Sequence, residues 1–306
     1  MRYIYGPVPS RRLGKSLGVD LVPLKTCTLS CRYCQIGNTP SPTLFRKPWV
    51  PLDDVLDELR KHLDAAPHPD RITFSGSGEP TLNSEIGAAI RAVKRMTDIP
   101  VCVITNGTLL WIPEVRDSLL EADTVMPSLD SAIEKTFRKL CRPHPDLTIT
   151  RIIEGLQSFR ESYAGAIWLE ILFVKDYNDT DQEIEALVEA ASRIQPDAIH
   201  LNTVVRPPAD STVEPVLREC LEEIRDRFGV RAEIIASFRE HVHHTVHTTA
   251  DDVREYLKRR PGDADSITRA LGAERSDVDR ILTLLQEAGD VRCVNYQGKQ
   301  YWEYCR

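Results

Sequence analysis

The chain has 306 residues, of which 42% are hydrophobic, 28% charged and 7% aromatic. This composition is typical of a folded globular protein and excludes collagenous, fibrous and intrinsically disordered chains. The sequence holds no uncharged apolar run of the roughly 18 residues that a membrane-spanning helix needs. Residues 1–15 also lack the apolar core of a signal peptide. We therefore expect a cytoplasmic protein with no membrane partner.

The net charge of −7 is unevenly distributed along the chain. Residues 1–48 hold eight basic side chains and one acidic side chain, Asp20, so this segment carries +7 and the remaining residues sum to −14. A basic segment on an acidic body indicates a local site for an anion, such as a carboxylate, a phosphate or an RNA backbone. A solvated basic surface is the alternative interpretation.

Short β-branched runs alternate with segments of helical periodicity over the first two-thirds of the chain. The expected strands cover residues 17–22, 72–75, 101–105, 124–128, 167–173, 198–204 and 232–236. The expected helices between them include residues 52–63, 86–96, 184–194 and 216–228. This alternation is typical of βαβ units and a parallel sheet. It predicts an α/β fold, either a full or partial β/α barrel or a doubly wound open sheet.

The pattern changes after residue 237, which predicts a boundary between residues 1–237 and a small second domain at 248–306. Residues 238–247 form a His-rich linker in this interpretation. The second domain begins with three expected helices at 250–259, 266–271 and 275–288. Two expected strands, 291–294 and 300–304, then flank Gln297-Gly298. Three helices followed by a hairpin predict a winged helix-turn-helix domain.

The charge of this second unit argues against duplex DNA as its partner. Residues 246–306 hold ten basic and eleven acidic side chains, whereas duplex binding rests on neutralising phosphates. Within the helix expected to enter the groove, residues 276–288 carry Asp277, Asp279 and Glu287 against Arg280 alone. We therefore expect this unit to contact a protein or peptide or to pack on the barrel. RNA binding at the basic edge, residues 258–260, is the alternative.

Eight cysteines in a chain without a secretion signal indicate reduced thiols instead of a disulfide framework. Cys27, Cys31 and Cys34 form a C-x3-C-x2-C loop at the end of the first expected strand. Three thiolates can hold three irons of a [4Fe-4S] cluster and leave the fourth open to a molecule with amino and carboxylate groups. Zinc is the alternative, although it usually takes paired ligand groups, and no second pair exists here. The other cysteines are scattered: Cys102, Cys141, Cys220, Cys293 and Cys305.

With this loop, residues 5–237 resemble the radical S-adenosylmethionine (radical SAM) superfamily. Three later segments, each at the end of an expected strand, are similar to motifs of that family in the same order. Ser77 stands where the family motif Gly-Gly-Glu-Pro has its first glycine. The resemblance implies a partial (β/α)6 barrel with its active site at the carboxyl ends of the strands. The segments are Ser75-Gly76-Ser77-Gly78-Glu79-Pro80, Thr105-Asn106-Gly107 and Ser128-Leu129-Asp130.

The resemblance also implies two cofactors, a [4Fe-4S] cluster on Cys27, Cys31 and Cys34, and SAM. It places Glu79 and the backbone around it at the methionine amino group of SAM and Tyr33 near the adenine. The segments after the third and fourth expected strands line the methionine and ribose. The implied SAM-binding residues are Tyr33, Gly76, Ser77, Gly78, Glu79, Thr105, Asn106, Ser128 and Asp130.

The implied activity is reductive cleavage of SAM to a 5'-deoxyadenosyl radical that abstracts hydrogen from a substrate. Such an oxidoreductase or lyase takes its electron from a donor such as a flavodoxin or ferredoxin. An alternative from another class is an iron-sulfur or metal-sensing regulator whose winged helix binds DNA.

Residues 5–14 and 172–179 are similar to a subfamily grouped with the wyosine-forming tRNA enzymes. Those enzymes carry additional cysteines ahead of the radical SAM loop, and residues 1–26 of this chain contain none. The prediction therefore takes over the chemistry of the subfamily and leaves the substrate open. An RNA base, a peptide or partner protein, and a small metabolite are the candidates.

Polar residues near the first strand and within or after the fifth and sixth are the expected substrate contacts. For Lys175 and Arg206 a surface ion pair is the alternative. The expected contacts are Arg11, Arg12, Glu170, Lys175, Asn178, Asn202 and Arg206. A separate imidazole cluster is either a transition-metal site or a polar linker; it comprises His241, His243, His244 and His247.

Overall fold

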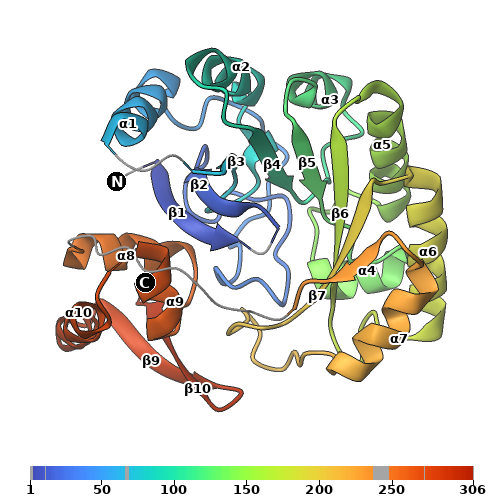
Figure 1. Cartoon of the computed structure of the whole chain (residues 1–306). Helices are drawn as coiled ribbons and strands as arrows, with labels where there is room; N and C mark the ends of the chain where they lie inside the picture. The colour runs from blue at the N-terminus through green and yellow to red at the C-terminus, as the bar shows by residue number, and fades with distance from the viewer. Residues whose placement is uncertain (1–2, 11, 66–68, 237–247, 272, 306) are drawn as a thin grey trace.

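The computed structural model describes residues 3–10, 12–65, 69–236, 248–271 and 273–305. Eight strands form a single sheet in which the spatial order follows the chain order (Figure 1). β1 and β2 pair antiparallel, and each later neighbour pairs parallel. The α/β class and the mostly parallel sheet are confirmed. The strands are β1 (Ile4–Ser10), β2 (Gly14–Val19), β3 (Arg71–Phe74), β4 (Val101–Thr105), β5 (Thr124–Pro127), β6 (Ala166–Phe173), β7 (Ala198–Thr203) and β8 (Ala232–Ile234).

Helices cover the outer face of this sheet and leave its inner face toward the middle of the molecule (Figure 1). Strand β6 shows the division, because Ile167, Leu169, Ile171 and Phe173 are fully buried while the residues between them are half-buried. Alternation of this kind places one set of side chains under the helices and the other on the inner face. The helices are α1 (Leu52–Ala65), η1 (Pro80–Leu82), α2 (Ile86–Met96), α3 (Pro113–Leu119), α4 (Glu134–Cys141), α5 (Ile149–Ser162), α6 (Asp181–Ile194) and α7 (Arg218–Phe228).

The turn between β1 and β2 fills the inner side of the sheet at the start of the strands. Leu13 in this turn is buried in a small cluster with Cys102 of β4 and Met126 of β5. Among the described strands β1 and β8 form no pair, so the sheet is an open one. This turn therefore covers part of the inner face near the N-terminal ends of the strands.

The last part of the chain has its own buried cluster of apolar side chains, separate from that of the sheet and its helices. Three helices precede an antiparallel hairpin, in the order predicted, and the winged-helix class itself remains a prediction. Thr249 and Asp252 form a capping box at the start of the first helix, as such residue pairs do. The elements are α8 (Ala250–Arg259), α9 (Ala264–Leu271), α10 (Arg275–Glu287), β9 (Val291–Tyr296) and β10 (Lys299–Tyr304).

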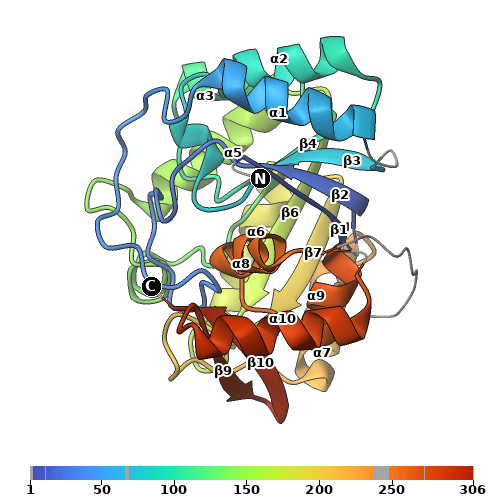
Figure 2. The same cartoon turned by 90° about the vertical axis from the view of Figure 1, so that its left-hand side faces the viewer.

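This C-terminal unit, residues 248–305, packs against β1 and the loop after β7 (Figure 2). The side chain of Val8 on β1 joins its apolar cluster. The Tyr301 hydroxyl donates to the Val205 carbonyl at 3.1 Å. The Arg259 guanidinium lies 4.9 Å from the centre of the Tyr5 ring. The unit therefore contacts edge strand β1 and the loop that follows β7.

Two expectations lie outside the described residues. These are the His-rich segment with its four histidines and Arg11. The described helices are all too short or too polar to cross a membrane.

Candidate active site

The loop after β2 carries the three cysteines and lies over the carboxyl ends of the strands. Its backbone is bonded on one side to the loop after β3, where Lys25 N donates to Ser77 O at 2.7 Å and Glu79 N donates to Thr26 O at 2.9 Å. A Cβ built on Gly78 would lie only 1.9 Å from the Thr26 oxygen. Glycine at this position therefore allows the two loops to approach closely.

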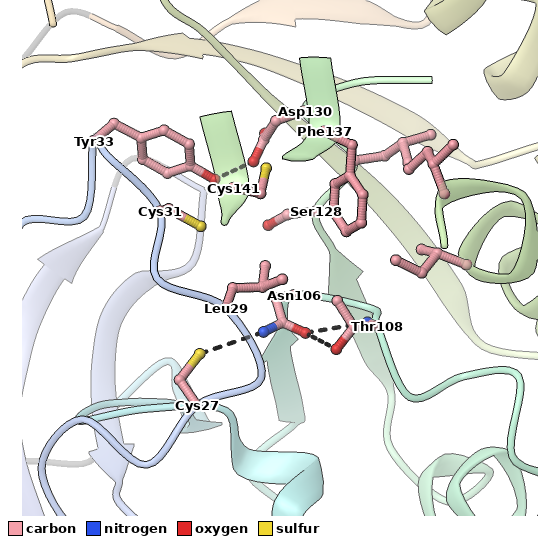
Figure 3. A pocket seen from close by; sticks show the side chains of 13 residues that line it. Cys27, Leu29, Cys31, Tyr33, Asn106, Thr108, Ser128, Asp130, Phe137 and Cys141 are labelled. Atoms are coloured by element: carbon pink, nitrogen blue, oxygen red, sulfur yellow. Dashed lines mark hydrogen bonds between the residues drawn. The ribbon is translucent and has the colours of Figure 1, made fainter. Parts of the chain in front are cut away.

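On its other side the cysteine loop meets the C-terminal end of α4. Ser30 N donates to Cys141 O at 3.1 Å, and Arg32 N donates to Leu140 O at 3.0 Å. The Cys141 thiol is buried and hydrogen-bonded to Cys31, and this contact together with burial raises the pKa of Cys141 above its ordinary value. Figure 3 shows Cys141 beside Cys31 and Asp130 at the edge of a pocket. A fourth cysteine thus borders the predicted cluster site.

The surroundings of the three half-buried thiols fit an iron-sulfur cluster. Lys25 Nζ lies 3.4 Å from Cys34 Sγ, and Asn106 Nδ2 lies 3.5 Å from Cys27 Sγ. Burial, followed by the charge of Glu79, raises the pKa of Cys27 to about 12, so its thiolate needs a metal as counter-charge. In the described part of the chain, no group of three His, Cys, Asp or Glu side chains is arranged to hold a single metal ion. A cube instead takes one iron per thiolate, which suits three sulfurs spread along a loop.

Glu79 joins the loops after β3 and β4. Its buried carboxylate accepts from Thr81 N at 3.0 Å, from the Thr105 hydroxyl at 2.6 Å and from Asn106 N at 2.7 Å. Burial raises the pKa of Glu79, and these hydrogen bonds oppose the rise. The carboxylate therefore fixes the loop that presents Asn106 to Cys27. Its expected contact with the SAM amino group stays a prediction.

The serine that departs from the family motif has a buried partner of its own. Ser77 donates from its backbone N at 3.0 Å and from its hydroxyl to Asp20 Oδ2. A Cβ on Gly76, whose φ is +139°, would lie 2.6 Å from the Asp20 carboxylate. Ser77 therefore binds this carboxylate, and the missing side chain of Gly76 leaves room for it at the start of the motif. Asp20 is a site residue that sequence reasoning missed.

Tyr33 and Asp130 lie side by side in the lining of the pocket in Figure 3. The Tyr33 hydroxyl donates to Asp130 Oδ2, and Leu172 N donates to Asp130 Oδ1 at 2.8 Å. Burial raises the pKa of Asp130 to about 6 despite these two hydrogen bonds. The pocket, of about 90 Å³, also takes in Cys27, Asn106 and Ser128. Side chains expected around SAM thus meet at this pocket from three segments, namely the cysteine loop and the loops after β4 and β5.

A cavity of about 1400 Å³ extends from the cysteine loop along the inner face to the C-terminal unit. Four of the expected substrate contacts line it: Arg12, Glu170, Asn202 and Arg206. Arg12 bonds the Glu170 carboxylate, which also accepts from Asn202 Nδ2 at 3.1 Å. Burial raises the pKa of Glu170, but the Arg12 charge outweighs this effect and lowers it below its ordinary value. Arg206 donates to Gln35 Oε1 at 3.0 Å.

Two other expected contacts occupy different places. Lys175 is exposed and pairs with Glu214 at 2.8 Å, as its alternative interpretation held. Asn178 is fully buried and spends its amide on backbone groups, donating to Asp130 O at 2.7 Å and Leu172 O at 2.8 Å. Neither side chain lines the large cavity. The structure therefore gives Lys175 a surface ion pair and Asn178 a positioning role behind Asp130.

Comparison with known proteins identifies the family. A family model described as the Radical SAM superfamily matches residues 21–191, more than half of the chain. The chain is 29% identical to a UPF0026 protein of Methanocaldococcus jannaschii, over 99% of this chain and 96% of that one. It is 33% identical to a UPF0026 protein of Synechocystis, over 67% of this chain and 76% of that one. The chain belongs to the radical SAM superfamily and, by these relatives, to the UPF0026 proteins.

A third relative, named GTPase Obg, of Brachyspira hyodysenteriae, is 35% identical over 94% of this chain. The chain spans only 43% of the length of that protein. Solved structures agree on the fold. SuiB of Streptococcus suis bound to S-adenosylmethionine has a TM-score of 0.55 at 17% identity, over 72% of this chain and 50% of that one. TYW1 with a lysine-pyruvate adduct has a TM-score of 0.52 at 17% identity, over 70% and 72%.

Proposed function

We propose that the protein is a radical SAM enzyme in which Cys27, Cys31 and Cys34 hold a [4Fe-4S] cluster beside bound SAM. When bound, these cofactors supply reductive cleavage of SAM to methionine and a 5'-deoxyadenosyl radical that abstracts hydrogen from a substrate. One observation carries the proposal: the cysteine loop lies over the carboxyl ends of parallel strands, at the mouth of a 1400 Å³ cavity. That volume exceeds the range of about 300 to 1000 Å³ usual for one ligand, so it suits SAM and a substrate together.

The chain's own residues orient and shield the cofactors. Asn106 and Lys25 direct donors at the Sγ atoms of Cys27 and Cys34, respectively. Hydrogen bonds to the ligand sulfurs tune a cluster's reduction potential. Glu79 fixes Asn106 and offers its buried carboxylate to the SAM amino group. Tyr33 and Asp130 bound the adenosine side of the site. Support for SAM as the ligand comes from the SuiB structure, which has the same fold and is bound to S-adenosylmethionine.

The substrate is proposed within the three classes left open by the sequence: an RNA base, a peptide or partner protein, or a small metabolite. An electron donor such as a flavodoxin or ferredoxin completes the reaction. We further propose that residues 1–237 form a partial (β/α)6 barrel, that 238–247 link it to a winged helix at 248–306, and that the protein is cytoplasmic. The regulator alternative gains no support from the relatives, and Asp277 and Asp279 at the start of α10 disfavour a phosphate backbone there.

The test is anaerobic reconstitution followed by incubation with dithionite and SAM. Wild-type protein should release 5'-deoxyadenosine, measured by liquid chromatography and mass spectrometry. Cys31→Ala should release none, because its cluster loses an anchor, whereas Cys220→Ala, at an exposed cysteine on α7, should match wild type. Wild-type protein that carries an intact cluster and still releases no 5'-deoxyadenosine would refute the proposal.

A further inference from the structure

The large cavity is lined jointly by the strands and by the C-terminal unit. From the strand side, Arg206 follows β7, and from the other side Tyr256 and Arg260 stand at the end of α8. Arg206 precedes the other two by at least fifty positions in the sequence, but all three line one cavity. The residues from 248 onward are therefore part of the cavity wall.

Contacts on both sides hold Arg206 in place. Its guanidinium donates to Gln35 Oε1 at 3.0 Å, and Gln35 directly follows the third cysteine of the cluster loop. The hairpin of the C-terminal unit bonds the two residues just before Arg206: Tyr301 donates to Val205 O at 3.1 Å, and Tyr296 donates to Val204 O at 3.4 Å. Arg206 is thus fixed beside the predicted cluster by groups from two parts of the chain.

Arg260 adds a second positive charge to the lining of the cavity. Its guanidinium lies 4.8 Å from the centre of the Tyr256 ring. In the part of the chain that the structure describes, no carboxylate forms an ion pair with it. Of the nearby acids, Asp263 accepts from Ser266 N and from the Ser266 hydroxyl, each at 2.8 Å, and its charge also acts on Arg206, whereas Glu255 pairs with Lys258 at 2.7 Å.

Tyr256 supplies a buried hydroxyl that lacks a partner. The side chain is only 6% exposed, and among the described residues its hydroxyl has no hydrogen-bond partner. Leaving a buried hydroxyl unsatisfied is unfavourable, so the group is available to donate to a ligand in the cavity that Tyr256 lines. The two arginine charges also act on each other: burial, then the charge of Arg260, lowers the pKa of Arg206 to about 10. An anion bound beside both guanidinium groups would offset this repulsion.

We propose that Arg206, Arg260 and the Tyr256 hydroxyl form an oxyanion site that binds a phosphate or carboxylate group of the substrate. This proposal rests on the proposed function for the identity of the ligand as substrate. It defines the substrate class as a molecule with an anionic group, held across the seam between the sheet and the C-terminal unit. Guanidinium groups bind both kinds of oxyanion in forked geometry.

The test is calorimetric titration of cluster-loaded, full-length protein saturated with SAM, without reductant and at constant ionic strength. Inorganic phosphate and acetate are used in separate arms. Saturable binding of phosphate assigns a phosphate-bearing substrate, and saturable binding of acetate assigns a carboxylate. Arg260→Gln should weaken the binding at least tenfold, and Tyr256→Phe severalfold while preserving the fold. Arg280→Gln is the matched control, because this exposed arginine on α10 pairs with Asp277 away from the cavity.

Absence of saturable binding in both arms would overturn the proposal. So would an Arg260→Gln variant that binds as wild type, or an Arg280→Gln variant that weakens binding equally. Release of 5'-deoxyadenosine separates this failure from that of the proposed function. Wild-type protein that cleaves SAM but binds neither anion refutes the oxyanion site alone, whereas protein that binds the anion but never cleaves SAM refutes the radical activity alone.

Discussion

Gly78→Ala should damage the cluster site through a single added methyl group. The new Cβ would lie 1.9 Å from the Thr26 oxygen, where ordinary contacts begin at 3.4 Å. The clash involves backbone on both sides, so the loop before Cys27 must move by about 1.5 Å. A displacement of about 1 Å in an active site can lower a rate by about a hundredfold. We expect a comparable loss of 5'-deoxyadenosine formation and a lower iron content per chain.

The assay compares iron content and initial rate after identical anaerobic reconstitution. Gly87→Ala on α2 is the control, because its Cβ meets Ser118 at 3.0 Å, far from the cysteine loop, and needs a shift of only a few tenths of an ångström. This control should keep its cluster and its rate. A Gly78→Ala protein with full iron content and the wild-type rate would refute the close contact between the two loops.

Three further predictions concern the same site. Alanine at Cys27, Cys31 or Cys34 should abolish the cluster absorbance and the paramagnetic signal of the reduced protein, while alanine at Cys102 should not; a normal signal in Cys31→Ala would contradict the assignment. Glu79→Ala should weaken SAM binding by about 1 to 3 kcal/mol, and unchanged affinity by calorimetry would limit Glu79 to its loop contacts. Because burial raises the pKa of Asp130 to about 6, the folded state holds a proton that the unfolded state has already lost, so stability should fall as pH rises from about 4 to about 6. Denaturant midpoints of Asp130→Asn should fall less over this pH window than those of wild type. An identical change of midpoint with pH in both proteins would contradict a raised pKa of the buried Asp130 carboxyl.

The sheet was largely predictable because its signal is local. Short β-branched runs gave β2 to β8 to within a few residues, and the cysteine spacing identified the loop after β2. Strand β1 escaped prediction because Gly6, Pro7 and Pro9 break its pattern, and proline is tolerated in sheets only at such edge positions. Helix α5 was missed although Ile149, Ile152, Ile153, Leu156 and Phe159 show helical spacing.

The arrangement of the site was predictable only where each motif sits at a strand end. Asp20 meets Ser77, and Cys141 meets Cys31, through contacts between segments far apart in the chain. Sequence periodicity carries no information on such pairs. The same limit explains Asn178 and Lys175: both follow β6 as expected, but which side of the loop each side chain occupies depends on tertiary packing. Tyr256 and Arg260 join the cavity only because the C-terminal unit packs on β1.

We propose above all that Cys27, Cys31 and Cys34 present an iron-sulfur cluster to SAM inside this cavity. Low-temperature electron paramagnetic resonance of the dithionite-reduced protein, recorded with and without SAM, tests it most directly. We expect a reduced [4Fe-4S] signal whose g values change when SAM is added, because SAM is proposed to bind at the iron that lacks a cysteine ligand. A cluster signal that is identical with and without saturating SAM would contradict it.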